Sequence, residues 1–466
     1  MLLLASFAIP AKADDTPWTG PSVWPVLDTT TRESVLAFGA DYLAFLASAK
    51  TERETIGRVL AAARAAGFTP APPRPALRRG EKLFFEAQGK AAVLVRGGRK
   101  PLTDGVRLIA AHVDSVRIDL KPNPIYEDVN VVLLQTQYYG AIHFAQWMSR
   151  PLALHGFALR ADGTPVTLRL GSEPADPVLV IPDVLVQLRS RVAAEAGDRL
   201  PAEKLDPIVA SLPAGEGPRR FARAFTELLQ QRYGLGPQEL RSAELSLVPA
   251  TGPRSVGLDQ ALVGGYGQDD RASVFAATRA LLALDAVPEH TAVLVLFDRQ
   301  EVGSTGPAGA RSDLLRRVLG GMLAGALGEA ASEQKLRELF VRSRALSADA
   351  TPAVDPHFKQ LHERRNAAYL GGGPVVNGAG GHAEQRAWLT RALGAARVPH
   401  QFAEFSRSVA HRPHADTLLP YLTRLGLAGA QLAVPLMSMH APFELASKAD
   451  VYLMSRACEA FFTAPE

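Results

Sequence analysis

Histidine and carboxylate residues recur in this sequence where apolar segments end. His112-Val113-Asp114 follows an apolar run at 106–111, and Glu301 follows another at 291–297. Three more positions, Asp269, Asp349 and His440, lie close to glycine-rich or apolar segments. Imidazole and carboxylate groups are the protein ligands of zinc, and also of cobalt or manganese, where thiolates are absent. Taken singly, each such residue more often has a structural role, and their combination is what predicts a metal site.

Two of these positions allow a more detailed interpretation. His112 and Asp114 are two residues apart, so in an extended chain both side chains point to the same face. Asp114 can then accept the ring N–H of a metal-bound His112 and fix its tautomer. Asp269-Asp270 directly precedes a predicted helix, and Asp is a preferred N-cap residue. On its own, Asp269 is therefore more simply interpreted as a helix cap than as a ligand.

The elements that must position these residues alternate between strands and helices. Buried strands are predicted over 106–111 and 291–297. A capping box at Thr51 and Glu54 begins an early amphipathic helix. Further helices are predicted over 273–284, 383–396 and 445–462. This alternation is typical of an α/β sheet with helices on both faces, in which sites form at strand ends.

The segment 121–254 has a different residue pattern, in which short alternating apolar stretches and turn residues replace long helical patterns. Its predicted elements are a hairpin over 151–159 and 166–170 and two polar helices around 184–196 and 219–233. We therefore predict an α/β fold in which residues 14–120 and 255–466 form a three-layer α/β/α domain. Residues 121–254 form a β-rich domain inserted into it.

The composition limits the classes of protein and partner. The chain has 466 residues, of which 47% are hydrophobic and 21% charged, as in an average soluble globular protein. The net charge of +4 comes without a run of five or six like charges, so nucleic acid is not an expected partner. No apolar run approaches the length of a membrane span. The single cysteine, Cys458, excludes an intramolecular disulfide and a zinc site of the CxxC type.

The N-terminus resembles a secretory signal segment. Residues 1–13 contain a short apolar run that ends in Ala11-Lys12-Ala13, an A-x-A cleavage pattern, but they lack a charged n-region. Export to the periplasm is the favoured interpretation. The alternative is a cytoplasmic protein with an apolar N-terminus.

The order of the candidate ligands matches the series of the co-catalytic di-zinc exopeptidases. The chain resembles the aspartyl aminopeptidase and vacuolar aminopeptidase family over nearly its whole length after the signal-like segment. The matching stretches are AAHVDS (110–115), QDDRAS (268–273), VLFDRQEVGS (295–304), ALSADATPAVDP (345–356), LGGGPVV (370–376), HADTLLPYL (414–422) and LMSMHAPFE (436–444).

This resemblance implies a di-zinc exopeptidase-type catalytic domain with two divalent metal ions, zinc before cobalt or manganese. One ion would be held by His112, Asp269 and Asp349, and the other by Asp269, Glu301 and His440, so that Asp269 bridges them. Such a pair activates a water molecule and polarises a peptide carbonyl. The resemblance also implies peptide substrates trimmed by single N-terminal residues, and an inserted domain that mediates assembly into dimers and dodecamers.

The chain departs from the family at the general base. Relatives have Asp-Asn-Glu-Glu where this chain has Asp298-Arg299-Gln300-Glu301, and the first Glu takes the proton of the water. Gln300 can hydrogen-bond a water but cannot accept its proton at neutral pH. General-base catalysis contributes about 10²–10⁴-fold, so turnover is slow unless Asp298, Asp270 or His414 replaces the base.

Three candidate substrate-binding positions also depart from the family. The family's Gly-Gly-Gly-x-Trp-His segment, whose His reaches a neighbouring subunit, aligns with 140–145, which places Ala145 at that His and His143 two residues early. Asn377 stands where relatives have a Lys. His414 lies where relatives have a Cys-Gly-Ser/Thr turn near the substrate.

Three hypotheses follow. The first is an active metalloaminopeptidase of relaxed or altered specificity. The second is a catalytically impaired pseudo-aminopeptidase that binds peptides or acts as a scaffold, for which Gln300 is the main argument. The third is a metal hydrolase of another substrate, such as an N-acyl amino acid, which would need its own base.

Overall fold

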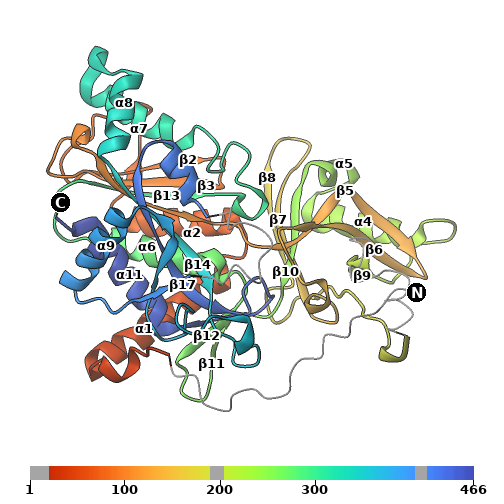
Figure 1. Ribbon diagram of the computed structural model, residues 1–466. Helices are drawn as coiled ribbons and strands as arrows, with labels where there is room; N and C mark the ends of the chain where they lie inside the picture. The colour runs from red at the N-terminus through yellow and green to blue at the C-terminus, as the bar shows by residue number, and fades with distance from the viewer. Residues whose placement is uncertain (1–19, 189–203, 405–416, 466) are drawn as a thin grey trace, which may run out of the picture.

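Two β-sheets organise the protein. The computed structural model describes residues 20–188, 204–404 and 417–465. A 12-stranded sheet lies on the left of Figure 1, and a six-stranded sheet lies on the right. The signal-like residues 1–13 and His414 fall outside the described residues.

The larger sheet has a parallel centre. Strands β13, β4, β14 and β17 are neighbours in this order and pair in parallel. The sheet contains β1 (Thr69–Pro70), β2 (Lys82–Ala87), β3 (Ala91–Arg96), β13 (Thr291–Phe297), β4 (Val106–His112), β14 (Arg344–Pro352), β17 (Ala428–Met437), β18 (Glu444–Ser447), β12 (Leu262–Gly265) and β11 (Arg254–Val256), with β15 (Val375–Gly381) and β16 (Gln401–Ala403) off this path.

Helices cover both faces of this sheet, because side chains alternate along each strand. In β4, Ile109 and Ala111 pack into one core, whereas Leu108 and Ala110 pack into the other. The first core is covered by α1 (Thr29–Ser48), α2 (Glu52–Ala65), α6 (Gln268–Leu282), α9 (Ala383–Ala395) and α11 (Lys448–Thr463). The second is covered by α7 (Leu314–Leu327), α8 (Glu333–Arg342) and α10 (Leu419–Arg424). The predicted three-layer α/β/α arrangement is confirmed.

The smaller sheet is antiparallel and forms its own core. Its strands, in spatial order, are β8 (Pro165–Leu170), β7 (Leu152–Leu159), β10 (Glu244–Pro249), β5 (Arg117–Asp128), β6 (Val131–Tyr139) and β9 (Ile208–Ala210). Apolar side chains of α4 (Arg220–Tyr233) and α5 (Pro237–Ser242) pack against this sheet. The β-rich insertion is thus present, and its division from the rest of the chain at 121 and 254 stays a prediction.

Most predicted elements have their expected positions. The capping box of Thr51 and Glu54 begins α2, and the strand 291–297 is β13. The helix predicted over 445–462 begins only at Lys448, because Glu444–Ser447 pairs with β12 and β17 as strand β18. The predicted helix around 184–196 is a short 3₁₀ turn at Val186–Leu188, and its remainder from 189 lies outside the described residues. None of the described helices has the length and apolar composition needed to cross a membrane.

Candidate metal centre

The candidate ligands gather at one edge of the larger sheet. His112 is the last residue of β4, and Asp349 lies near the end of the neighbouring strand β14. Glu301 lies in a 3₁₀ turn, η6 (Gln300–Val302), just after β13, and His440 follows β17. Because the four central strands are parallel, their carboxyl ends meet at the same edge. The fold therefore brings together residues that are far apart in sequence.

Asp269 reaches this edge from the start of α6. Gly267 occupies the N-cap position with φ 73°, and both Asp269 and Asp270 have non-helical backbone angles, joined by a cis peptide bond. Glu444 accepts hydrogen bonds from the backbone N–H groups of Gln268 and Asp269, at 2.5 and 3.2 Å. The simple interpretation of Asp269 as a helix cap is therefore wrong, because its side chain points towards two histidines instead of capping the helix.

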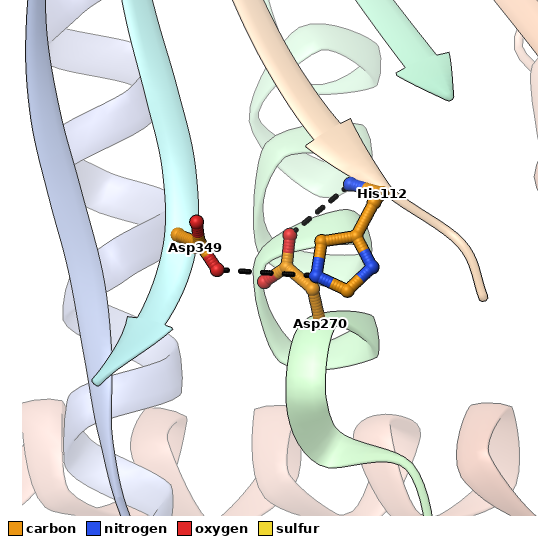
Figure 2. Close-up of side chains that lie close together, drawn as sticks. All are labelled: His112, Asp270 and Asp349. Atoms are coloured by element: carbon orange, nitrogen blue, oxygen red, sulfur yellow. Dashed lines mark hydrogen bonds and ion pairs between the residues drawn. The ribbon is translucent and has the colours of Figure 1, made fainter. Parts of the chain in front are cut away.

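The first group of potential ligands surrounds His112. Its Nε2 atom lies 3.4 Å from Asp269 Oδ1 and 3.9 Å from Asp349 Oδ1. Asp270 adjoins this group, as Figure 2 shows, and its Oδ2 accepts the backbone N–H of His112 at 3.2 Å. Asp270 is thus engaged with the backbone behind His112, while Asp349 faces the imidazole ring.

The second group surrounds His440. Its Nε2 atom lies 3.1 Å from Asp269 Oδ2 and 3.6 Å from Glu301 Oε1. Asp269 therefore presents one carboxylate oxygen to His112 and the other to His440. This is the arrangement of a carboxylate that can bridge two cations.

The geometry and the unpaired oxygens of this site fit metal ions. Within the described part of the chain, Asp269 Oδ1, Asp270 Oδ1 and Glu301 Oε1 are buried and make no hydrogen bond. A buried carboxylate oxygen without a partner is costly. Tetrahedral zinc with ligands at 2.0–2.1 Å places neighbouring ligand atoms about 3.3 Å apart, close to the 3.1–3.9 Å separations observed here. A cation in each group would satisfy the oxygens of Asp269 and Glu301.

The charges of the site lead to the same conclusion. Burial, with the nearby Asp269 carboxylate, raises the pKa of Glu301 to about 8 and that of Asp349 to about 7. Burial opposes a charge on His440, but Asp269 and Glu301 raise its pKa to about 10. If all the carboxylates of the site were ionised, their negative charge would exceed the positive charge that the two imidazoles can carry. Divalent cations would keep the carboxylates ionised and the imidazoles neutral.

Asp114 supports both groups from behind. Its Oδ1 accepts the backbone N–H of Gln300 at 3.0 Å, and its Oδ2 accepts that of Glu301 at 3.1 Å. His112 Nδ1 lies 3.1 Å from the backbone oxygen of Asp114 and 3.3 Å from Oδ1. The expected contact with His112 is thus shared between the carbonyl and the carboxylate, because the carboxylate also holds the turn that carries Glu301.

Glu444 is a second support, which the sequence reasoning missed. Besides the two N–H groups at the start of α6, it accepts the backbone N–H of His440 at 2.8 Å through Oε1. One fully buried carboxylate therefore ties the loop of His440 to the loop of Asp269. Glu444 lies only four residues after His440 in the sequence, but no spacing rule distinguishes such a residue from an ordinary strand residue.

The remaining predicted positions are less closely tied to the metal groups. Gln300 is buried, at 8% exposure, in the turn next to Glu301. His143 is exposed and stacks on Phe144, with ring centroids 5.9 Å apart. Asn377 lies half-buried in β15. His414 lies outside the described residues, so its predicted substrate contact stays a prediction, as do those of His143 and Asn377.

Strand-end histidines and carboxylates on a three-layer α/β/α domain define a metal-dependent hydrolase of the exopeptidase type. The family model described as aminopeptidase I zinc metalloprotease (M18) matches residues 45–462. The chain belongs to this family of zinc aminopeptidases.

Individual relatives agree with this assignment over nearly their full lengths. A probable M18 family aminopeptidase 1 from Clostridium acetobutylicum is 33% identical over 457 residues, which span 94% of this chain and 97% of the relative. The crystal structure of an M18 family aminopeptidase from Thermotoga maritima superimposes with a TM-score of 0.89 at 31% identity, covering 95% of this chain and 99% of that chain. The crystal structure of aminopeptidase I from Borrelia burgdorferi superimposes with a TM-score of 0.82 at 28% identity, covering 95% of this chain and 100% of that chain.

Proposed function

We propose that this protein releases single N-terminal residues from peptides, using two divalent cations, most favourably zinc. His112, Asp269 and Asp349 would hold one cation, and Asp269, Glu301 and His440 the other. The observation that carries this proposal is the placement of Asp269, whose two oxygens face two different imidazoles at 3.4 and 3.1 Å. A structural carboxylate would need donors on both oxygens, whereas its Oδ1 makes no hydrogen bond.

The side chains around the cations have separate tasks. When bound, a pair of cations supplies the Lewis acidity that activates water and polarises the scissile carbonyl. Asp114 holds His112 and the Glu301 turn in place, as its contacts support. Gln300 can orient a water through its amide but cannot take the proton. Asp298 and Asp270 are the candidate replacements for the base within the described residues. They are buried, at 2% and 0% exposure, and already accept the backbone N–H groups of Arg299 and His112, respectively.

The assembly of relatives suggests an assembly for this chain. One distant structural neighbour, at 18% identity and a TM-score of 0.75, is a yeast mApe1 dodecamer. We propose that this chain also forms a homo-oligomer, a dimer or a dodecamer, through the domain at 121–254. Exposed apolar side chains of that segment, such as Leu212 at 79% and Leu228 at 53% exposure, support an interface there.

A second candidate function follows from Gln300. With both cations bound but no carboxylate to accept the proton, the protein would bind peptides and hydrolyse few of them. It would then serve as a peptide-binding protein or scaffold. The metal ligands are the same in both candidates, so metal binding alone does not separate them.

Catalytic rates separate them. Wild type, Gln300→Glu and Gln300→Met are compared with added zinc, cobalt or manganese for release of Asp, Glu, Leu and Ala from chromogenic amides. Gln300→Met is the matched control, because it changes the same side chain without adding a base. N-acetylated amino acids test the remaining hypothesis, a hydrolase of blocked amino groups.

An active aminopeptidase predicts turnover by wild type that Gln300→Glu changes little. An impaired enzyme predicts an inert wild type in which Gln300→Glu, but not Gln300→Met, restores turnover by about 10²–10⁴-fold. Activity on N-acetylated substrates alone contradicts both candidates. Failure of wild type to bind any of the three metals contradicts the proposed site itself.

A further inference from the structure

A tyrosine of the smaller sheet reaches the metal centre. Tyr139 is the last residue of β6, and its side chain is buried, with 6% of the residue exposed. Its hydroxyl donates to Asp114 Oδ2 at 3.0 Å. The oxygen that receives this bond also accepts the backbone N–H of Glu301. The second sheet thus contributes a donor to the residue that supports both ligand groups.

The surroundings of Tyr139 favour a fixed, protonated donor. Burial and the carboxylate of Asp114 raise the pKa of Tyr139 well above its ordinary value, so the phenol keeps its proton. The guanidinium of Arg117 lies 3.8 Å from the centre of the tyrosine ring. Arg117 is itself held by Asp119, at 2.7 Å, and Glu52, at 3.2 Å. The ring therefore has a packed cation on its face and has little freedom to turn away.

The next residue brings the same strand end against a ligand. Gly140 has φ 74°, and a Cβ atom at this position would lie 2.7 Å from Val116 Cγ1 and 3.4 Å from Glu301 Oε2. The backbone that leaves β6 therefore passes directly beside the Glu301 side chain. Contact with the metal centre is made by two consecutive residues, not by Tyr139 alone.

We propose that Tyr139 is a positioning residue, which orients the Asp114 carboxylate and through it both His112 and Glu301, one ligand of each cation. Asp114 has two oxygens and serves Gln300, Glu301 and His112, so a rotation of its carboxylate would disturb several contacts at once. The Tyr139 hydroxyl resists this rotation through its bond to Oδ2, the oxygen that also accepts the backbone N–H of Glu301. The proposal rests on the metal ligands proposed above.

The test compares two tyrosines that each lose one buried hydroxyl. Tyr139→Phe removes the bond to Asp114. Tyr266→Phe is the matched control, because Tyr266 is also 6% exposed and its hydroxyl donates to the backbone oxygen of Val116 at 2.9 Å. Zinc affinity is measured by competition with a chromogenic chelator, and thermal unfolding of the metal-free proteins is measured alongside.

We expect Tyr139→Phe to weaken zinc binding by about 10–100-fold, the usual effect of losing a partner behind a ligand. Tyr266→Phe should lower the thermal midpoint similarly and leave zinc affinity within about threefold of wild type. In an Asp114→Asn background, Tyr139→Phe should add little further loss, because both changes act through one carboxylate.

Other results would overturn the proposal. Equal zinc affinities of Tyr139→Phe and Tyr266→Phe would mean that Tyr139 only contributes to stability, as would fully additive effects with Asp114→Asn. If Tyr139→Phe is too unstable to titrate, zinc affinities of Gly140→Ala and wild type decide, since an unchanged affinity shows that this strand end does not position the centre. A wild type that binds no zinc refutes the metal site and this proposal together.

Discussion

Glu54 joins the helix α2 to the smaller sheet, and its substitution gives a sharp test of how the two parts are held together. Its Oε2 accepts the backbone N–H groups of Lys50 and Thr51, at 3.0 and 3.1 Å, as part of the capping box. Its Oε1 lies 3.0 Å from His155 Nδ1 and 3.0 Å from Arg169 Nε. His155 is fully buried and also contacts Ser172 at 2.6 Å.

The cost of Glu54→Gln can be worked out from these contacts. Glutamine keeps an acceptor oxygen for the capping box, but its NH₂ group faces His155. Loss of one buried hydrogen bond to a charged group costs about 1.5–3 kcal/mol. The pair with Arg169, whose side chain is 39% exposed, adds less than about 1 kcal/mol. We expect a loss of about 2–3 kcal/mol, which is about 2–3 °C in the thermal midpoint for a chain of 466 residues that unfolds as one unit.

The pH dependence of this loss has a definite sign. Burial alone would raise the pKa of Glu54, but His155 and Arg169 lower it overall. A carboxyl whose pKa is lower in the folded state than the unfolded value of about 4.3 contributes its stability above that value. The contribution disappears as the pH falls through the lower, folded-state pKa. The difference between wild type and Glu54→Gln should therefore be present at pH 5 and above and vanish in stronger acid.

The assay is thermal or urea unfolding of both proteins from pH 3 to 7. Glu244→Gln is the matched control, because Glu244 also connects the two parts, through Arg53 at 2.8 Å and Lys90 at 2.6 Å, but its side chain is 44% exposed. It should cost less than about 1 kcal/mol. Equal losses for the two substitutions, or a Glu54→Gln effect that grows in acid, would refute the reasoning.

Three substitutions and the removal of metal test the metal centre further. Asp269→Asn should abolish binding of both cations, because both groups use this side chain, whereas Asp349→Asn should remove only the cation beside His112; atomic spectroscopy of the dialysed proteins counts the ions. Gly140→Ala should lower both stability and zinc affinity, because its Cβ would meet Val116 at 2.7 Å in a backbone conformation with φ 74° that favours glycine. Calorimetry of Gly140→Ala and wild type checks this. Removal of metal with a chelator should lower the thermal midpoint, and added zinc should restore it.

Much of this fold could be predicted from local sequence. The strand 291–297 and the capping box at Thr51 and Glu54 are encoded by short stretches, and both occur as predicted. The start of α11 could not be predicted, because residues 445–447 continue an amphipathic helical pattern yet pair with β12 as part of β18. Pairing with a distant strand outweighed local propensity there.

The candidate site also depends partly on short stretches of sequence and partly on contacts between segments that are far apart in the chain. The types and order of the five candidate ligands predicted a metal site, and the stretches around them predicted the family. Asp269 on its own predicted a helix cap, because capping and metal binding use the same residue at the same place in a sequence. Only the tertiary structure shows that His112 and His440 lie beside the two oxygens of Asp269, which favours the role of a ligand over that of a cap.

The sequence by itself determined which residues could bind metal and at which strand ends they lie, because ligand chemistry and hydrophobic periodicity are properties of short segments. The tertiary structure alone decided which oxygen faces which imidazole, and it brought Glu444 to the backbone of His440 and Tyr139 to the carboxylate of Asp114. The physical reason is that a buried hydrogen bond depends on separations of a few tenths of an ångström between segments far apart in the chain. Only packing around a common core fixes such separations.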